Sequence, residues 1–197
     1  MKILLLLTVL TISLLSHGMV HAIEKPDFKL LKKDGKFELR QYSELHIVTA
    51  TMEEESQRNQ AFRKLAGYIG KKNEKGQKIA MTSPVLIDGA KVTERESTLK
   101  PSMSFVVPKN VVEGGIPKPN DPSISLSKIE GGKFAVKAFK NSNSDKSRKE
   151  ALEELRVWIG KQKLQAIGEA SFAFYDPPWI PQMFRTNEVW IRVEKVE

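Results

Sequence analysis

A ten-residue pattern occurs twice in this chain, ninety residues apart, and it limits the possible folds more than any other feature. The copies are AFRKLAGYIG at residues 61–70 and ALEELRVWIG at residues 151–160, and both follow A-Φ-x-x-L-x-x-aromatic-I-G. Apolar residues at i, i+3, i+4, i+7 and i+8 are typical of the buried face of a helix. Because the pattern recurs, it also indicates a duplicated supersecondary unit. We therefore expect two equivalent helices in one pseudo-symmetric domain.

Strand-like segments flank both copies. Before and after the first copy they are residues 36–41 and 45–52, expected to pair as a hairpin, then 78–87, an edge strand or two short strands because it contains Pro84, and 103–107. Around the second copy they are residues 124–129 and 133–139, expected to form a hairpin about Glu130-Gly131-Gly132, then 169–175 and 188–193. Residues 24–33 are expected to be a charged lead-in without a strand.

Each half therefore follows the order ββαββ, with a capping box at Ser147 and Glu150 before the second helix. Runs of strands with one helix per half indicate the α+β class. We expect duplicated halves whose two helices pack on one mostly antiparallel sheet that curls toward a distorted barrel.

The first 22 residues, MKILLLLTVLTISLLSHGMVHA, combine Lys2, an apolar run at residues 3–15 and a small-residue exit at Ala22. This organisation is typical of a secretory signal peptide cleaved after Ala22. A membrane anchor is the alternative, but the apolar run is shorter than the roughly 20 residues needed to cross a bilayer. We expect export to the periplasm or the extracellular medium, with residues 23–197 forming a single domain.

The composition excludes several classes of function. The chain has no Cys, so disulfides, Cys-ligated metals and thiol nucleophiles are excluded. Its net charge of +8 is spread along the sequence without a nucleic-acid recognition motif, so nucleic acid is not an expected partner. Two interpretations of the charge remain open: a solvated surface, or weak attraction to an anionic membrane surface or small molecule.

Three motifs lie in these segments. They are K-I-x-M-T-x-P-V at residues 78–85, Y-x-P-P-W with R-x-N-E-V at residues 175–179 and 185–189, and FELRQY at residues 37–42. Together they resemble the SOUL/haem-binding protein family, from about residue 37 to residue 193. The resemblance implies a duplicated α+β domain with a distorted barrel-like sheet. It also implies noncovalent binding of haem or another tetrapyrrole in a hydrophobic groove beside the first helix.

Small residues on the first helix are compatible with such a groove. Asn59, Arg63, Ala66 and Gly70 share a face next to the apolar stripe, and a flat ligand could lie there with Arg63 near a carboxylate. The second copy has Arg156 and Val157 in place of Ala66 and Gly67, so only the first half is expected to bind. The alternative is that the small residues only allow close helix packing. The expected ligand-binding residues are Asn59, Phe62, Arg63, Ala66, Gly67, Gly70 and Met81.

The identity of a metal ligand is left open by the sequence. Gln41 stands where some members of the family carry a His, and Gln is a poor iron ligand. His46 is the only His after the expected cleavage, and a lone strand His is more typical of a surface residue. Met81 and Tyr42 are other possible donors. Tyr175, Trp179 and Arg185 either line a pocket or fix the last hairpin.

Three functions follow from this. The first is an exported, noncovalent haem or tetrapyrrole binding protein. The second is a binding module that uses the same groove for another amphipathic small molecule or an envelope partner. The third, an enzyme acting on such a ligand, lacks the HExxH, G-x-S-x-G and phosphate-loop motifs. The physiological ligand and the oligomeric state stay open.

Overall fold

The computed structural model describes residues 23–89, 100–140, 144–177 and 179–196. The expected signal peptide lies outside these residues. The first half contains β1 (Phe28–Asp34), β2 (Phe37–Tyr42), β3 (Leu45–Thr51), the 3-10 helix η1 (Glu55–Gln57), α1 (Arg58–Ile69), β4 (Val85–Asp88) and β5 (Ser102–Val106). After α2 (Lys109–Glu113), the second half contains β6 (Ile124–Ile129), β7 (Gly132–Phe139), α3 (Asp145–Lys161), β8 (Leu164–Phe174), the 3-10 helix η2 (Gln182–Phe184) and β9 (Asn187–Lys195).

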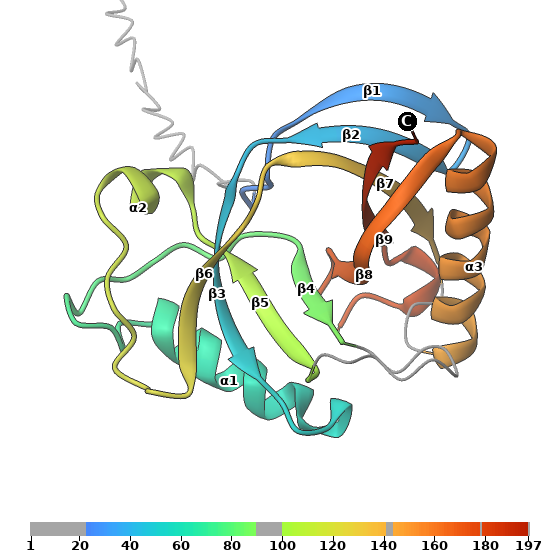
Figure 1. Cartoon of the computed structure of the whole chain (residues 1–197). Helices are drawn as coiled ribbons and strands as arrows, with labels where there is room; N and C mark the ends of the chain where they lie inside the picture. The colour runs from blue at the N-terminus through green and yellow to red at the C-terminus, as the bar shows by residue number, and fades with distance from the viewer. Residues whose placement is uncertain (1–22, 90–99, 141–143, 178, 197) are drawn as a thin grey trace, which may run out of the picture.

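The nine strands of the described residues form one antiparallel sheet in the order β1-β2-β7-β9-β8-β4-β5-β3-β6 (Figure 1). If β1 is set aside, this order reads the same from both ends once β2 is matched with β6, β3 with β7, β4 with β8 and β5 with β9. The two halves are therefore related by a pseudo-two-fold axis between β4 and β8. This confirms the duplicated ββαββ arrangement and the α+β class, with a curled sheet that is not closed.

Both predicted hairpins are wrong. β2 pairs with β1 and β7, whereas β3 pairs with β5 and β6. β2 runs on into β3, and β6 runs on into β7, as two bent strands that lie antiparallel, with Tyr42 opposite Gly132. A Cβ on Gly131 would lie 3.0 Å from the backbone nitrogen of Glu44. The Gly-Gly pair therefore permits two segments of the chain to approach closely, where the sequence pattern predicted a turn.

Other boundaries also differ from expectation. Residues 28–34, expected to be without a strand, form edge strand β1. All seven of its residues are exposed, so its sequence carries no alternation of buried and exposed positions that could have indicated a strand. β4 begins after Pro84 but is an inner strand between β5 and β8. The helix α2, in the connection between β5 and β6, was not predicted. The N-cap of α3 is Ser144, whose side chain accepts a hydrogen bond from the Ser147 nitrogen, so the capping position precedes the predicted one by three residues.

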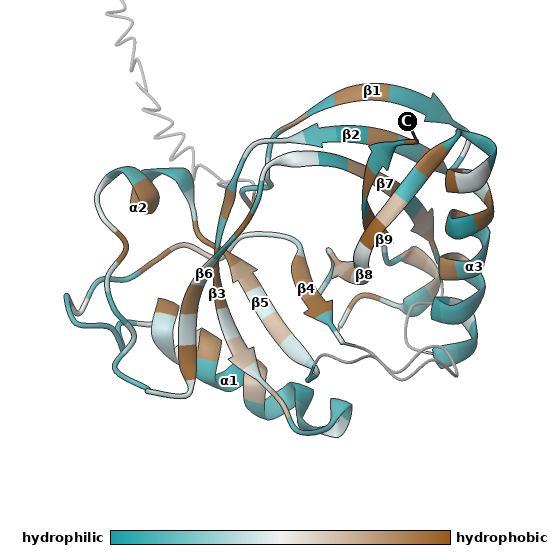
Figure 2. Cartoon of the chain, in the orientation of Figure 1, coloured by the Kyte–Doolittle hydropathy of each residue, from teal (hydrophilic) through white to brown (hydrophobic). Residues whose placement is uncertain are grey.

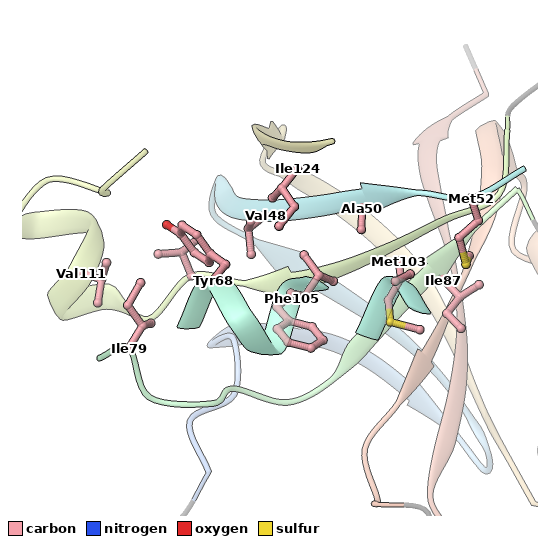
Figure 3. Close-up of a cluster of buried hydrophobic side chains, with 13 residues drawn as sticks. Val48, Ala50, Met52, Tyr68, Ile79, Ile87, Met103, Phe105, Val111 and Ile124 are labelled. Atoms are coloured by element: carbon pink, nitrogen blue, oxygen red, sulfur yellow. The ribbon is translucent and has the colours of Figure 1, made fainter. Parts of the chain in front are cut away.

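The two helices pack on the same face of the sheet, as the repeat predicted. Hydrophobic and hydrophilic residues alternate along both of them (Figure 2). Their buried stripes occupy matching positions, namely Ala61, Leu65 and Tyr68 in α1 and Ala151, Leu155 and Trp158 in α3. Figure 3 shows Phe105, Met103 and Ile87 in the cluster against α1. The opposite face of the sheet buries a third cluster, which includes Tyr42, Phe134 and Trp190.

Candidate functional site

The helix α1 covers less of the sheet than α3 does. α3 packs against β7, β8 and β9, whereas α1 packs mainly against β3 and β5. The strand pairing places Phe105, Val85 and Phe174 in one row across β5, β4 and β8. Of these, Phe105 is buried, whereas Val85 and Phe174 are only partly buried. The side chains of Val85 on β4 and Phe174 on β8 therefore form a partly exposed apolar surface beside α1, because the helix does not cover these two strands.

Phe62 extends this surface from the helix. Its ring centroid lies 5.5 Å from that of Phe105, and 43% of the residue is exposed. Met81 is partly buried against the same cluster. We call Phe62, Met81, Val85 and Phe174 the α1 flank. Two of these four residues, Phe62 and Met81, were expected from the sequence to bind a ligand.

The other predicted site residues lie at different angles around α1. Ala66 is partly buried and lies about 40° from Phe62, so it borders the α1 flank. Arg63 is exposed and lies on the side of the helix opposite Ala61, away from the sheet. Asn59 is also exposed. Their contact with a ligand stays a prediction.

Two predicted site residues are glycines with different surroundings. A Cβ on Gly70 would lie 2.8 Å from the carbonyl oxygen of Ala66, and the residue forms an isolated bridge with Lys78. A Cβ on Gly67 would lie 3.2 Å from Cδ of Lys72, which is part of a flexible side chain. Close backbone packing is therefore sufficient to require glycine at position 70 but not at position 67.

Arg58 is a cation beside the α1 flank, and it was not among the ligand-binding residues predicted from the sequence. Its guanidinium carbon lies 5.8 Å from the ring centroid of Phe174, and its Nη2 donates to Glu55 at 2.9 Å. Burial and the neighbouring Arg148 lower the pKa of Arg58. Its Nε is buried without a hydrogen-bond partner. The spacing gave a usable signal, because Arg58 precedes Phe62 by one helical turn.

Glu55 connects the beginnings of the two helices. Its two carboxylate oxygens accept hydrogen bonds from Nη1 and Nη2 of Arg148, each at 3.0 Å. Arg148 is 2% exposed and also contacts Asp145. Burial alone would raise the pKa of Glu55, but the two arginines hold it below its usual value. The cation beside the α1 flank is therefore positioned by a charge network that includes α3.

Two of the three sequence motifs, FELRQY and Y-x-P-P-W with R-x-N-E-V, meet on the other face of the sheet. Nη1 and Nη2 of Arg40 donate to Glu188 at 2.9 and 2.8 Å, and Nη1 also donates to the hydroxyl of Tyr42 at 3.1 Å. The hydroxyl of Tyr175 and Nε1 of Trp190 donate to Glu188 at 2.6 and 2.7 Å. We call Arg40, Tyr42, Tyr175, Glu188 and Trp190 the latch. It joins β2 to β9, and Tyr175 therefore helps to fix the last hairpin.

The latch lies beside a cavity of about 300 Å³ whose lining includes Lys25, Phe28 and Thr186. Burial raises the pKa of Tyr42 to about 12, and burial together with Glu188 raises that of Tyr175 further. Burial would lower the pKa of Arg40, but the ion pair with Glu188 raises it. Every guanidinium nitrogen of Arg40 has a partner, since Nε donates to Glu38 at 2.7 Å. The latch is therefore satisfied internally and acts as a structural link.

The comparisons with known proteins identify the family. A family model described as "SOUL heme-binding protein" matches residues 23–192. The chain belongs to this SOUL family. Mouse "Heme-binding protein 2" is 28% identical over 181 residues, which cover 86% of each chain. These matches confirm the resemblance carried by the three motifs, and they support haem binding by this SOUL protein.

Solved structures share the fold at low sequence identity. The crystal structure of the EcmrR C-terminal domain has a TM-score of 0.62 and 14% identity, and the match covers 81% of this chain and 98% of that one. A structure described as a hydrolase from Listeria innocua has a TM-score of 0.54 and 11% identity, with 83% and 94% covered. At these identities the likeness shows the fold alone.

The possible axial donors of this SOUL protein are distributed over several sites. Nε2 of His46 lies 3.3 Å from Glu44, and His46 lines a cavity of about 370 Å³ with residues of α2. Gln41 lines a different cavity, with Arg192. The hydroxyl of Tyr42 belongs to the latch. Of the donors considered from the sequence, Met81 is the one that lies on the α1 flank.

Proposed function

We propose that this SOUL protein binds haem or a related tetrapyrrole noncovalently on the α1 flank. The observation that carries the proposal is the apolar surface of Val85 and Phe174 on the sheet and Phe62 on α1, which stays partly exposed because α1 lies mainly against β3 and β5. A porphyrin needs a flat apolar surface for its ring and cations for its propionates. Arg58 supplies a cation at the edge of this surface, whereas Arg63 is exposed on the side of α1 opposite Ala61.

The residues present fit haem held mainly by apolar contact. Met81 offers a thioether as an axial donor, a ligand that haem iron accepts in other proteins. Among the described residues, no group of three His, Asp or Glu side chains is placed to hold a metal ion. Haem, when bound, supplies the chemistry of its iron, and the protein supplies apolar packing and charge.

Export is part of the proposal. The signal-peptide pattern of residues 1–22 supports cleavage after Ala22 and delivery to the periplasm or the medium. Within the described residues, none of the helices is both long and apolar enough to span a membrane. N-terminal sequencing of the protein recovered from outside the cytoplasm should give Ile23 as the first residue. An intact N-terminus would contradict cleavage.

A haemin titration tests the ligand and the place. Protein beginning at Ile23, which contains every described residue, should give a saturable Soret change at micromolar concentration. The Phe62→Asp variant should bind at least tenfold more weakly, because it places a carboxylate on the apolar surface. Val157→Asp is the matched control, since Val157 is 58% exposed on α3. It should bind normally.

Two results of this titration would overturn the proposal in different ways. The absence of a saturable Soret change in the unsubstituted protein would remove haem as the ligand. Equal affinities for the Phe62→Asp and Val157→Asp variants would leave haem in place but move it away from the α1 flank.

The second candidate is another amphipathic small molecule, or an envelope partner, on the same flank. It is favoured by the position of His46, which lines a cavity with α2 residues and leaves the flank without an imidazole donor. A ligand that binds the folded state raises the unfolding temperature. Stabilisation by other amphiphiles, with none from haemin, would select this candidate. Conversion of the bound ligand into a product would instead indicate an enzyme.

A further inference from the structure

The connection between β8 and β9 exposes large apolar side chains. Trp179 is 80% exposed, Met183 is 66% exposed and Phe184 is 67% exposed. These are the three most exposed large apolar residues of the part of the chain that the structure describes. We call residues 179–184 the apolar loop. Side chains exposed to this extent project from the surface, and a cluster of them indicates a site of interaction.

The apolar loop is held by its own hydrogen bonds. The nitrogen of Ile180 donates to the carbonyl of Pro177 at 3.1 Å, and the nitrogen of Phe184 donates to that of Pro181 at 2.9 Å. Nε of Arg185 donates to the carbonyl of Ile180 at 2.7 Å. Pro181, with φ −55°, leads into the 3-10 helix η2, and Trp179 and Phe184, on the two sides of this proline in the sequence, are exposed.

The base of the loop is attached to the latch. The nitrogen of Tyr175 donates to the carbonyl of Thr186 at 3.3 Å, and the nitrogen of Thr186 donates to the carboxylate of Asp176. The hydroxyl of Tyr175 donates to Glu188. Because its base is fixed on the sheet, the loop loses little conformational entropy on binding a partner.

We propose that the apolar loop docks the protein on anionic membrane surfaces. Trp and Phe are the side chains that favour the interface between water and lipid, and here they project from a short turn. The chain has a net charge of +8, of which +7 remains in the protein beginning at Ile23 because Lys2 is the only charged side chain removed, and this charge attracts it to anionic lipid. Nζ of Lys25 lies 5.2 Å from the ring centroid of Tyr175, so a cation lies at the base of the loop. The proposal uses residues other than the α1 flank and is independent of haem binding.

Tryptophan fluorescence can follow this docking directly. Trp158 and Trp190 are 4% and 3% exposed, so Trp179 is the tryptophan whose surroundings a vesicle would change. Protein beginning at Ile23 is mixed with vesicles of phosphatidylcholine alone or with 30% phosphatidylglycerol. We expect a blue shift, quenching by brominated acyl chains and co-sedimentation with the anionic vesicles. The absence of all three would overturn the proposal, and equal binding to both vesicles would overturn its electrostatic part.

Substitutions then separate the loop from the general charge. The Trp179→Ser/Phe184→Ser variant should lose at least tenfold in co-sedimentation at unchanged unfolding temperature, because both side chains are exposed. The matched control is Leu31→Ser/Val157→Ser, which removes two exposed apolar residues from β1 and α3 and should bind normally. Undiminished binding by the loop variant would mean that charge alone holds the protein, against the proposal.

Two further measurements distinguish other roles of the loop. Sedimentation without lipid tests for a second copy of the chain, and self-association that depends on Trp179 would overturn the membrane assignment. Haemin titration of the loop variant should match that of the unsubstituted protein. If the loop variant lost as much affinity for haemin as for vesicles, the loop would belong to the haem site instead. If it lost vesicle binding alone, the proposed binding of haem on the α1 flank would be unaffected.

Discussion

The two halves of the molecule share one pattern but use their helices differently. α3 has 17 residues and packs on three strands, whereas α1 has 12 residues and packs mainly on two. The matched stripe positions are buried in both helices. Two of the positions that differ, Ala66 and Gly67 against Arg156 and Val157, lie outside the stripe. The residues that pack the helices on the sheet are therefore shared by the two halves. The α1 flank is exposed because α1 packs on fewer strands than α3 does.

The matched stripe gives the largest expected effect. Leu65 and Leu155 are both 0% exposed, so Leu65→Ala and Leu155→Ala should each lower the free energy of unfolding by about 2–5 kcal/mol. Urea denaturation monitored by circular dichroism measures both losses. Because the residues are equivalent, we expect the two losses to agree within about 1 kcal/mol. A much smaller loss for Leu65→Ala would mean that the α1 half is loosely packed, and the equivalence of the halves would fail.

Glu55 tests how firmly the two helices are tied together. The Glu55→Gln variant should lose about 1–3 kcal/mol at pH 7, because the buried Arg148 then loses the carboxylate that accepts from both its Nη1 and its Nη2, while it keeps its contact with Asp145. The pKa of Glu55 is lowered in the folded state, so its contribution is complete above the ordinary value of 4.5. It is lost as the pH falls through the lower folded pKa. Urea denaturation at several pH values should therefore show the two proteins converging in acid.

The conservative control is Glu55→Asp. It keeps the negative charge, so at pH 7 its free energy of unfolding should lie between that of Glu55→Gln and that of the unsubstituted protein. A difference between Glu55→Gln and the unsubstituted protein that persisted unchanged into strong acid would contradict an electrostatic role. It would mean instead that the side chain of residue 55 stabilises the protein through packing, and that charge does not contribute to holding the beginnings of α1 and α3 together.

The sequence predicted the elements that repeat and missed those defined by distant partners. The stripes of α1 and α3 were predictable because helical periodicity is local. The pairing of β2 with β7 was not, because Gly131-Gly132 is equally compatible with a turn and with a close approach of two strands. The latch joins Arg40 to Glu188, which lies 148 positions later in the chain. Arg58 borders the α1 flank because α1 packs mainly on β3 and β5 and leaves β4 and β8 partly uncovered. The pairing within the latch depends on tertiary placement that the motifs do not encode, whereas the helical spacing of Arg58 and Phe62 places both residues on one side of α1 but does not show that this side borders exposed sheet.

The smallest expected effect separates two glycines that occupy the same place in the repeat. A Cβ on Gly70 would lie 2.8 Å from the carbonyl oxygen of Ala66, whereas a Cβ on Gly160 would have no atom within 4 Å. Gly70→Ala should therefore lower the free energy of unfolding by about 1 kcal/mol. Gly160→Ala should raise it by about 0.5–1 kcal/mol, since alanine is the better helix former. Thermal unfolding of both variants beside the unsubstituted protein would reveal the opposite signs. Two changes of the same sign would mean that the end of α1 is built like the end of α3, and the asymmetry between the halves would then begin only beyond the helices.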